Sequence, residues 1–444
     1  MENSLTQYIE LFHAQRQAIE AAAPAVLNTL RGKALNVLEA VRLPRKGQED
    51  YEATDMNAIF APDYGVNVNR FDLARNFTPT FSCDLPNLGT TPVYMVGDTI
   101  VVPGKELADG VVVTSFAQAA KTCPELLERH YGTVARLDNA ATALNTLLAQ
   151  DGLLVYVPRG VKARPLQLIN IFNANAPLMA VRRILLVAEE HAQVQMLVCD
   201  HTQNEAQRYL SNQVVEIIAR EGASVDYYDM EESTPLTSRV SALYVKQEGG
   251  SNVLVDGITL DCGTTRNDYH FDVAGERAES HLLGMAIASG TQHIDNHTFI
   301  DHSAPRCTSR EMFKYILGDN AVGAFAGKIL VRPGCPGTDA YQGNRNLVTS
   351  STAKMYTKPQ LEIYTDDVQC SHGSTIGQLD EDALFYMRSR GVSEETARTL
   401  LMQAFMADVI EGMRIGTLKE RLYHLVERRL AGDDATCDNC PIRK

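Results

Sequence analysis

The chain lacks the features that mark membrane, secreted and nucleic-acid-binding proteins. Its longest purely apolar runs, such as Ile184 to Ala188, fall far short of the roughly 18 residues that a membrane helix needs. The N-terminal segment has no basic start and no apolar core, so we expect no secretory signal peptide. No run of five basic residues occurs, and the formal net charge of −14 disfavours nucleic acid and anionic membranes as partners. We therefore expect a cytoplasmic protein without membrane insertion.

The motifs of several common enzyme classes are also missing. The sequence contains no GxxxxGK[ST] phosphate loop, no GxGxxG after a strand, no HExxH and no GxSxG. Without them the chain has no recognisable means of hydrolysing ATP or transferring acyl groups. We predict a protein that is not itself an enzyme.

What the chain does have is material for a large core. It has 444 residues, of which 45% are hydrophobic and 22% charged, so two or three domains or an elongated repeat are expected. Its nine cysteines are expected to be reduced and mostly small buried side chains. Cys437 and Cys440 form a CxxC half-site for zinc or a redox pair, within a segment, 433–444, that is predicted to be a flexible tail.

The pattern of apolar residues changes along the chain and predicts four segments. Residues 1–95 are predicted to form an N-terminal helical region followed by a polar connector that begins with residues 43–65. Residues 96–375 are rich in short strands, with a helical insertion at about 116–150 in which two helices are expected. Residues 376–432 are predicted to be helical again, and the flexible tail follows.

Several residues predict where the helices begin and end. Ser4 is expected to cap the first helix and Pro24 to interrupt it. Gly391 and Ser393 are expected to end one C-terminal helix and cap the next, and Thr417 to open the last through a capping box. The predicted apolar face of the second C-terminal helix comprises Ala397, Leu400, Leu401, Ala404, Phe405 and Val409. That of the last helix comprises Leu418, Leu422, Leu425 and Val426.

A weak internal repeat runs through the strand-rich segment. Each unit is a strand, a small or acidic turn with alanine or glycine, and a further strand. The turns centre on Ala192, Ala223, Gly250, Ala278, Ala321 and Ala353, with gaps of 31, 27, 28, 43 and 32 residues. Each unit would be one rung of a β-solenoid. A single rung cannot bury its own inner face, whereas stacked rungs share one core, so the spacing favours this fold. A β-sandwich is the alternative, although few Asn-Gly or Asp-Gly hairpin turns are present.

Two groups of residues have the chemistry of metal ligands. The first contains His293, Asp295, His297, Asp301 and His302. On a strand the first three would share one face, with His302 beyond a turn. We interpret this group as a polar strand face and a turn rather than a zinc site, because spacing alone is a weak signal for a metal.

The second group is Cys370 and His372, which follow a pair of aspartates. On a strand these two side chains would point to the same side, about 7 Å apart. Thiol and imidazole suit iron or copper(I), but two ligands cannot complete a site. A partner chain or other segments would have to supply the rest, and a Cys-x-His taken alone is more often a packing feature.

The segment from Lys358 to Val392, KPQLEIYTDDVQCSHGSTIGQLDEDALFYMRSRGV, resembles the SufB/SufD family of iron–sulfur cluster assembly proteins. The resemblance continues in segments 144–161, 296–317 and 324–331, and covers roughly residues 100 to 425. The chain is most similar to SufD, because GQLDEDALFYMRSRG after CSHG and the HTFIDHSAP segment have the SufD-like form. It also lacks the N-terminal cysteine cluster of many SufB proteins.

The chain departs from the family pattern at a few positions. Tyr51-Glu52 stands where Trp-Lys is usual, which puts a connector contact in doubt, and Ser374 stands where alanine is usual. Cys199 lies one position away from a cysteine of SufB-like chains, so that residue's role is not carried over.

The resemblance implies a right-handed parallel β-helix flanked by N-terminal and C-terminal helical regions. It further implies a scaffold subunit that works with a SufB-like sister chain and a SufC-like ABC ATPase, the ATP being hydrolysed by that partner. His372, with Cys370, would be a candidate interface ligand for iron or a nascent iron–sulfur cluster shared with the partner, and none would be bound stably by the chain alone. The His–Asp group would lie inside the β-helix.

The same resemblance assigns the partner surfaces. The last β-helix rungs would pair with the sister chain, and the helices after Asp380 would dock the ATPase. The candidate docking residues are Asp380, Phe385, Tyr386, Arg388, Arg390, Leu400 and Phe405. Two alternatives stay open: a homodimeric structural β-helix without a metal role, and a β-helix carbohydrate-active enzyme.

Overall fold

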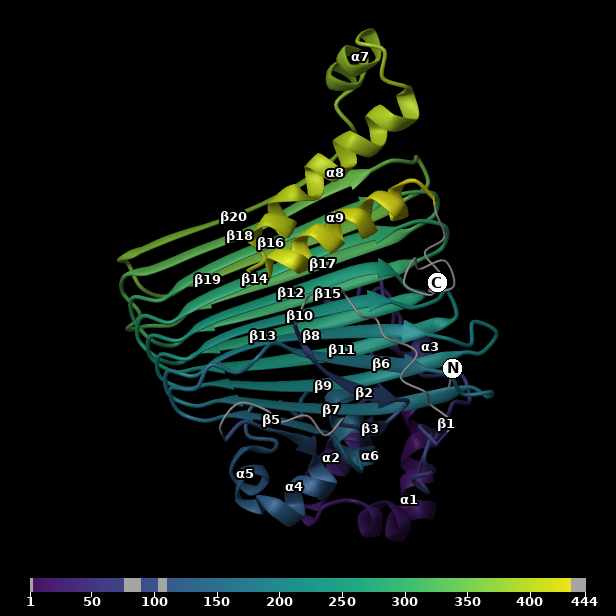
Figure 1. Ribbon diagram of the computed structural model, residues 1–444, viewed down its shortest axis with the longest axis vertical. Coiled ribbons are helices and arrows are strands. Elements are labelled where there is room, and N and C mark those ends of the chain that lie inside the picture. The colour runs from purple at the N-terminus through teal and green to yellow at the C-terminus, as the bar shows by residue number, and fades with distance from the viewer. Residues whose placement is uncertain (1–2, 76–88, 103–109, 433–444) are drawn as a thin grey trace.

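The structure is a computed structural model that describes residues 3–75, 89–102 and 110–432. Two ten-stranded sheets face each other and form its body (Figure 1). Sheet 1 comprises β1 (Gly65–Val66), β4 (Val112–Ser115), β5 (Leu153–Val157), β7 (Leu178–Ala188), β9 (Tyr209–Ala219), β11 (Thr237–Gln247), β13 (Thr264–Val273), β15 (His293–His302), β17 (Val322–Val331) and β19 (Lys354–Ile363). Sheet 2 comprises β2 (Thr91–Val96), β3 (Thr99–Val101), β6 (Leu166–Phe172), β8 (Gln193–Thr202), β10 (Ser224–Glu232), β12 (Asn252–Asp261), β14 (Glu279–Ala288), β16 (Thr308–Leu317), β18 (Thr338–Val348) and β20 (Val368–Gly377).

From β5 onward the chain alternates between the two sheets. Each rung adds one strand to each sheet, and every pairing between successive rungs is parallel, whereas the β2–β3 and β4–β5 pairs near the start are antiparallel. This is a parallel β-helix, as predicted, and the sandwich alternative is wrong. Most strands from β7 to β18 are ten or eleven residues long, so the rungs stack into a body of nearly constant width.

The turns that the repeat identified belong to two different stacks. Ala192, Ala223 and Ala278 lie in turns that lead from sheet 1 to sheet 2. Ala321 and Ala353 lie in turns that lead from sheet 2 back to sheet 1. The 43-residue gap is therefore the step from one stack to the other, and no rung is that much longer than its neighbours.

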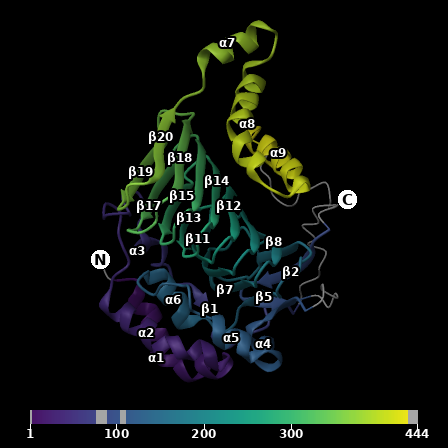
Figure 2. The ribbon, with the colours of Figure 1, turned by 90° about the vertical axis from the view of Figure 1, so that its left-hand side faces the viewer.

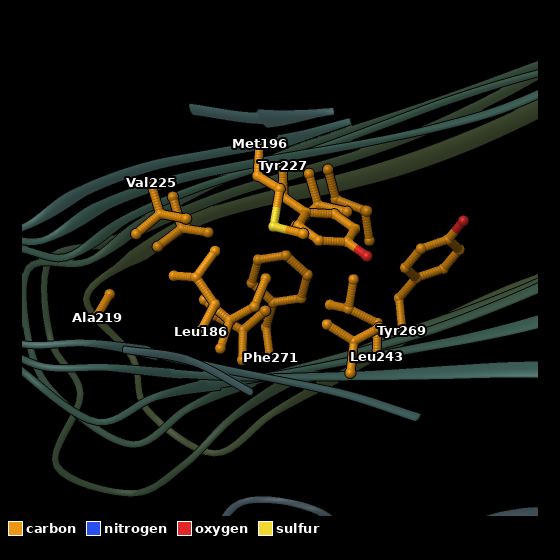
Figure 3. Packing of buried hydrophobic residues seen from close by; sticks show 14 of the residues in the cluster. Leu186, Met196, Ala219, Val225, Tyr227, Leu243, Tyr269 and Phe271 are labelled. Carbon is orange, nitrogen blue, oxygen red and sulfur yellow. The ribbon is translucent and has the colours of Figure 1, made fainter. Parts of the chain in front are cut away.

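Inward side chains of both sheets pack into one continuous core (Figure 3). Its members near the middle of the solenoid include Leu186, Ala219, Leu243, Tyr269 and Phe271 of sheet 1, and Met196, Val225 and Tyr227 of sheet 2. All of these are buried, because each rung covers the rung before it.

Helices gather at the N-terminal end of the solenoid and on the outer side of sheet 1, where the short α3 lies further along the sheet than the others (Figures 1 and 2). They are α1 (Leu5–Ala22), α2 (Ala25–Ala40), α3 (Met56–Ile59), α4 (Phe116–Thr122), α5 (Pro124–His130) and α6 (Ala140–Leu148). Pro24 separates the first two helices, as predicted. The predicted capping bond of Ser4 is wrong, because its hydroxyl donates to the backbone carbonyl of Asn57 at 2.8 Å. The insertion holds three helices, since Pro124 starts a new one where a single helix was expected.

The C-terminal helices are α7 (Glu381–Ser389), α8 (Glu394–Gly412) and α9 (Gly416–Leu430). Ser393 caps α8 as predicted, and Gly391 follows α7 with a φ of +91° that suits glycine. The capping box predicted at Thr417 is wrong, because α9 begins one residue earlier without a side-chain cap. No helix in the described ranges combines the length and apolar character needed to cross a membrane.

These three helices divide between two locations. The predicted face of α9 and the second half of α8 pack on the outer side of sheet 2. Helix α7 instead projects past the edge formed by β20 (Figure 1). The C-terminal helical segment therefore does two things: α9 and the second half of α8 cover the solenoid, and α7 reaches beyond it.

Candidate functional site on the last rung

Strands β19 and β20 form the last rung, and it lies open at the end opposite α1 and α2 (Figure 1). Each pairs with a single strand, β17 or β18, so one edge of each has backbone groups free to pair. Ile363 and Ile376 continue the inner columns of side chains but are 39% and 53% exposed. The hydrophobic interior of the solenoid therefore reaches the surface at this rung.

Exposed apolar side chains concentrate at this end of the molecule. The described residues include nine large exposed hydrophobic side chains. Four of them, Tyr356, Ile363, Tyr364 and Ile376, lie on or next to the last rung. Three more, Phe385, Tyr386 and Leu400, lie on α7 and the start of α8. Grouped apolar exposure of this kind is typical of a surface that binds another protein.

Cys370 and His372 both lie on β20, as alternate residues that face inward. Their backbone partners on β18 are Ala340 and Gln342. Cys370 packs against the solenoid core, and this burial raises the pKa of its thiol, which keeps it protonated. The imidazole of His372 is exposed. The prediction that the two side chains share one side of a strand is confirmed, and His372 is the more exposed of the two.

The described part of the chain contains no group of three or more His, Cys, Asp and Glu side chains arranged to hold a metal ion. Cys370 and His372 are two potential ligands, and a bound iron or cluster needs more than two. The last rung therefore presents two potential ligands at an open surface, fewer than a metal site needs.

The His–Asp group of β15 lies mostly outside the solenoid. His293, Asp295 and His297 share one face of β15, as predicted, but that face is the outer one and the connector covers it. The hydroxyl of Thr54 lies 2.7 Å from Nε2 of His293 and also donates to Asp295. Nε2 of His297 lies 3.0 Å from Oδ1 of Asp295. The expectation that this group lies inside the β-helix is wrong for these three residues.

The two other members of that group are separated from it. His302 is the last residue of β15 rather than a residue beyond a turn, and its Nε2 lies 2.9 Å from the Ser309 hydroxyl in the interior. Burial lowers the pKa of His302 to about 4, so it is neutral. Asp301 accepts two hydrogen bonds from Arg332, at 2.8 and 2.7 Å. Each side chain of the group is thus engaged in structural contacts.

The connector fastens the N-terminal region to the last rung. The ring of Tyr51 stacks on His297, with centroids 6.2 Å apart, and the guanidinium of Arg266 lies 4.4 Å from the centroid of the Tyr51 ring. Nζ of Lys358, on β19, lies 3.1 Å from Oδ1 of Asp50 and 3.4 Å from Oε1 of Glu52. The connector contact is therefore made, and Tyr51 itself takes part in it although tryptophan is usual at this position. The sequence did not indicate the contribution of Lys358.

The candidate docking residues on α7 differ in their exposure. Phe385 and Tyr386 are 74% and 59% exposed. The guanidinium of Arg390 lies 5.2 Å from the Tyr386 ring centroid, and Arg388 pairs with Glu394 at 3.2 Å. The helix therefore presents an aromatic surface flanked by cations.

The remaining docking candidates have other surroundings. The carboxylate of Asp380 caps α7 by accepting from two backbone N–H groups at 2.9 and 3.0 Å. Leu400 is 44% exposed on α8. Phe405 packs against sheet 2, where Nζ of Lys314 lies 4.9 Å from its ring centroid and donates to its backbone carbonyl at 2.6 Å. The structure thus separates Leu400, which is accessible, from Phe405, which joins the helices to the solenoid.

Two family models match this chain. One, described as the SufBD core domain of the SUF system for FeS cluster assembly, matches residues 170–405, and the other, the SufBD protein N-terminal region, matches residues 2–168. The chain belongs to the SufBD family. The function of this family is iron–sulfur cluster assembly, and the resemblance predicted from the CSHG segment is confirmed.

Two similar members of the SufBD family span nearly the whole chain, and a third matches part of it. A SufBD family protein of Synechocystis is 28% identical over 437 residues, which cover 95% of each chain. SufD of Bacillus subtilis is 25% identical over 444 residues, covering 96% of this chain and 97% of that protein. SufD of Escherichia coli is 35% identical over 167 residues, covering 38% of this chain and 40% of that protein. The predicted likeness to SufD is borne out.

Two cysteine predictions remain outside this picture. Cys199 is buried on the outer side of sheet 2, where it joins the cluster that seats α8 and α9. Cys437 and Cys440, with the rest of the predicted tail, lie outside the described residues.

Proposed function

We propose that this SufBD family member is the SufD-like scaffold subunit of a cytoplasmic SUF-type complex. In that complex it supports iron acquisition and cluster assembly together with a SufB-like sister chain and a SufC-like ATPase. The observation that supports this most is the open last rung, where an exposed imidazole lies among uncovered apolar side chains.

The last rung suits a sister chain of the same fold. The free edges of β19 and β20 can each add a parallel or antiparallel strand, and a second rung placed on them would cover Ile363 and Ile376. His372 would then lie at the junction of the two chains. An imidazole nitrogen is a good ligand for iron, and the sister chain supplies the ligands that are missing here. Iron or a nascent cluster is the cargo of this junction and is not held stably by one chain.

Helix α7 and the start of α8 suit the ATPase. Their exposed aromatic and aliphatic side chains stand clear of the solenoid, and anchors of this type dominate the affinity of protein interfaces. The energy source is then the partner, in agreement with the absence of a phosphate loop from this sequence. Lys314 of β16 pairs with Asp408 of α8 at 2.7 Å, so α8 is tied directly to the solenoid two strands before β20.

The Ile376→Asp variant tests the position of the sister-chain interface. Anaerobic co-expression of the chain with the SufB-like and SufC-like proteins of its own source is expected to give a three-component complex. A carboxylate on the covered rung would be buried without a partner, so we expect the sister chain to bind at least about tenfold more weakly. Complex composition by size and native mass, and affinity by titration, are the measurements.

The matched control is Leu236→Asp, because Leu236 is exposed in a loop away from the last rung. It should leave the complex intact. A chain that ignores both partners and forms a stable homodimer through its last rung would contradict the proposal in favour of the homodimeric alternative. Equal losses in the two variants would contradict the placement of the interface.

A further inference from the structure

An inner column of side chains runs through the last three rungs of sheet 2 and ends at His372. Glu311 on β16 is in register with Gln342 on β18, and Gln342 is in register with His372 on β20. Successive strands of a sheet lie about 4.8 Å apart, so inward side chains at one register position contact one another. Gln342 is therefore the inward neighbour of His372 on the rung beneath it.

The amide of Gln342 is held in one orientation. Its side chain is fully buried, and its Nε2 donates to Oε2 of Glu311 at 3.0 Å. The hydroxyl of Thr298, from the facing sheet, donates to the other carboxylate oxygen at 2.6 Å. Because an amide donates only through its nitrogen, the bond to Glu311 leaves the carbonyl oxygen of Gln342 to face another partner.

The facing sheet also makes room for this amide. Gly327 lies on β17, and a Cβ placed on it would come within 2.4 Å of Nε2 of Gln342. Any side chain at position 327 would therefore displace the amide. A glycine at this point keeps the column from Glu311 to Gln342 in place.

The carbonyl oxygen of Gln342 has no partner. Its Oε1 is buried and accepts no hydrogen bond from any residue that the structure describes. Buried acceptors are rarely left unpaired, and each exception calls for an explanation. The next side chain in the same column is the imidazole of His372, whose ring nitrogens are hydrogen-bond donors or acceptors according to the tautomer.

We propose that Gln342 is a positioning residue for His372. Its carbonyl oxygen accepts the N–H of one ring nitrogen, which fixes the tautomer and turns the lone pair of the other nitrogen toward the open end of the solenoid. Imidazoles that ligate metals commonly donate their second N–H in this way, and the bond makes the ligand more basic. This inference rests on the proposed function for the role of the metal, but the tautomer is a property of the free chain. Glu311 and Thr298 act through Gln342 and do not contact the metal.

The test compares Gln342→Met with Gln247→Met. Methionine has nearly the shape of glutamine and no amide, and Gln247 is a buried inward glutamine on β11, far from His372. The first measurement is the tautomer of His372 in the full metal-free chain, from the ring nitrogen shifts in NMR at pH 8. Burial raises the pKa of Glu311 to about 7, so its carboxylate is mostly charged at that pH and the Gln342 amide is oriented. We expect one tautomer in the wild type and in Gln247→Met, and a mixture in Gln342→Met.

The second measurement is Fe(II) affinity in the complex with the sister chain. We expect about a 10- to 100-fold loss in Gln342→Met and no change in Gln247→Met. Gly327→Ala is the second variant, in case methionine at position 342 perturbs folding, and it should produce the same mixture by displacing the amide. Thermal unfolding confirms that each variant is folded.

The two measurements separate the two ideas. A tautomer that is the same in the wild type, Gln342→Met and Gly327→Ala overturns the positioning role of Gln342, whatever the iron content. A tautomer that becomes mixed in both variants, in a complex whose wild type binds no iron, supports the positioning role and contradicts the proposed function.

Discussion

Replacing Asp256 with asparagine is expected to raise the free energy of unfolding by about 4 kcal/mol at pH 7. Asp256 lies on β12, and both of its carboxylate oxygens are buried without a hydrogen-bond partner in the described structure. Burial alone raises its pKa to about 8, because no cation compensates the charge. The asparagine variant removes the ionisable group and keeps nearly the same shape.

Because of where Asp256 lies, the substitution should also affect how the C-terminal helices pack on sheet 2. Its neighbours in register on the outer side of sheet 2 are Tyr228 and Leu283, both in the cluster that seats α8 and α9. The hydroxyl of Tyr228 accepts the backbone N–H of Arg414 between those helices at 2.9 Å. The C-terminal helices are therefore seated over a buried carboxyl group, so the variant should hold them more firmly.

The pH dependence gives the sign of the effect. The folded state keeps the Asp256 proton up to about pH 8, whereas the unfolded chain loses it near pH 4. Over that window the unfolded state binds fewer protons, so the stability of the wild type falls as the pH rises. The difference between variant and wild type should be small near pH 4, about 4 kcal/mol at pH 7 and constant above pH 8.

Denaturant unfolding at a series of pH values measures this difference. Asp226→Asn is the matched control, because Asp226 lies on neighbouring β10 and accepts from Arg414 at 2.8 Å and from Gln195 at 2.9 Å. That variant removes a paired charge and should not stabilise the protein. A stability difference for Asp256→Asn that does not change with pH would contradict the assignment of an uncompensated carboxyl group.

Replacing Phe385 and Tyr386 together with alanine is expected to weaken binding of the ATPase by on the order of 1000-fold. Both rings are largely exposed on α7, which projects beyond β20. Central aromatic anchors each contribute about 2 kcal/mol or more to protein association. In the free chain neither ring packs in the core, and Tyr386 contacts Arg390 at the surface. The thermal stability of the free chain should therefore stay unchanged.

Calorimetric titration of the purified ATPase into the chain measures this loss. Phe71→Ala is the control, because Phe71 is equally exposed but lies in the N-terminal region. It should bind like the wild type. Full affinity of the double variant would show that the ATPase docks elsewhere on the chain.

The sequence predicted the solenoid because its repeat follows the rungs, but it could not assign the faces of every strand. The outward direction of His293 and His297 was within reach, since Ile294 and Ile300 alternate with them and occupy the core. The partners of Arg182 and Arg239 were not, because their carboxylates come from other strands. A fully buried arginine depends on such contacts between the two facing sheets, which a local pattern does not contain.

The C-terminal helices show a second limit of the sequence. Leu400 and Phe405 were predicted to share one apolar face of α8, yet only Phe405 packs on the sheet. The helix is longer than the surface beneath it, so its first half extends past β20 with part of the apolar face exposed. Periodicity identifies an apolar face but not the protein surface that covers it.

The central claim is that His372 on the open rung is a ligand of the cargo, and the iron and sulfide content of the anaerobic complex tests it most directly. Wild type, His372→Ala and the control Ser371→Ala, an exposed neighbour on the other side of β20, are each co-expressed with the sister chain and the ATPase. We expect all three complexes to assemble, with iron and acid-labile sulfide per complex reduced to a small fraction only in His372→Ala. An intact His372→Ala complex with the iron and sulfide content of the wild type would contradict the account.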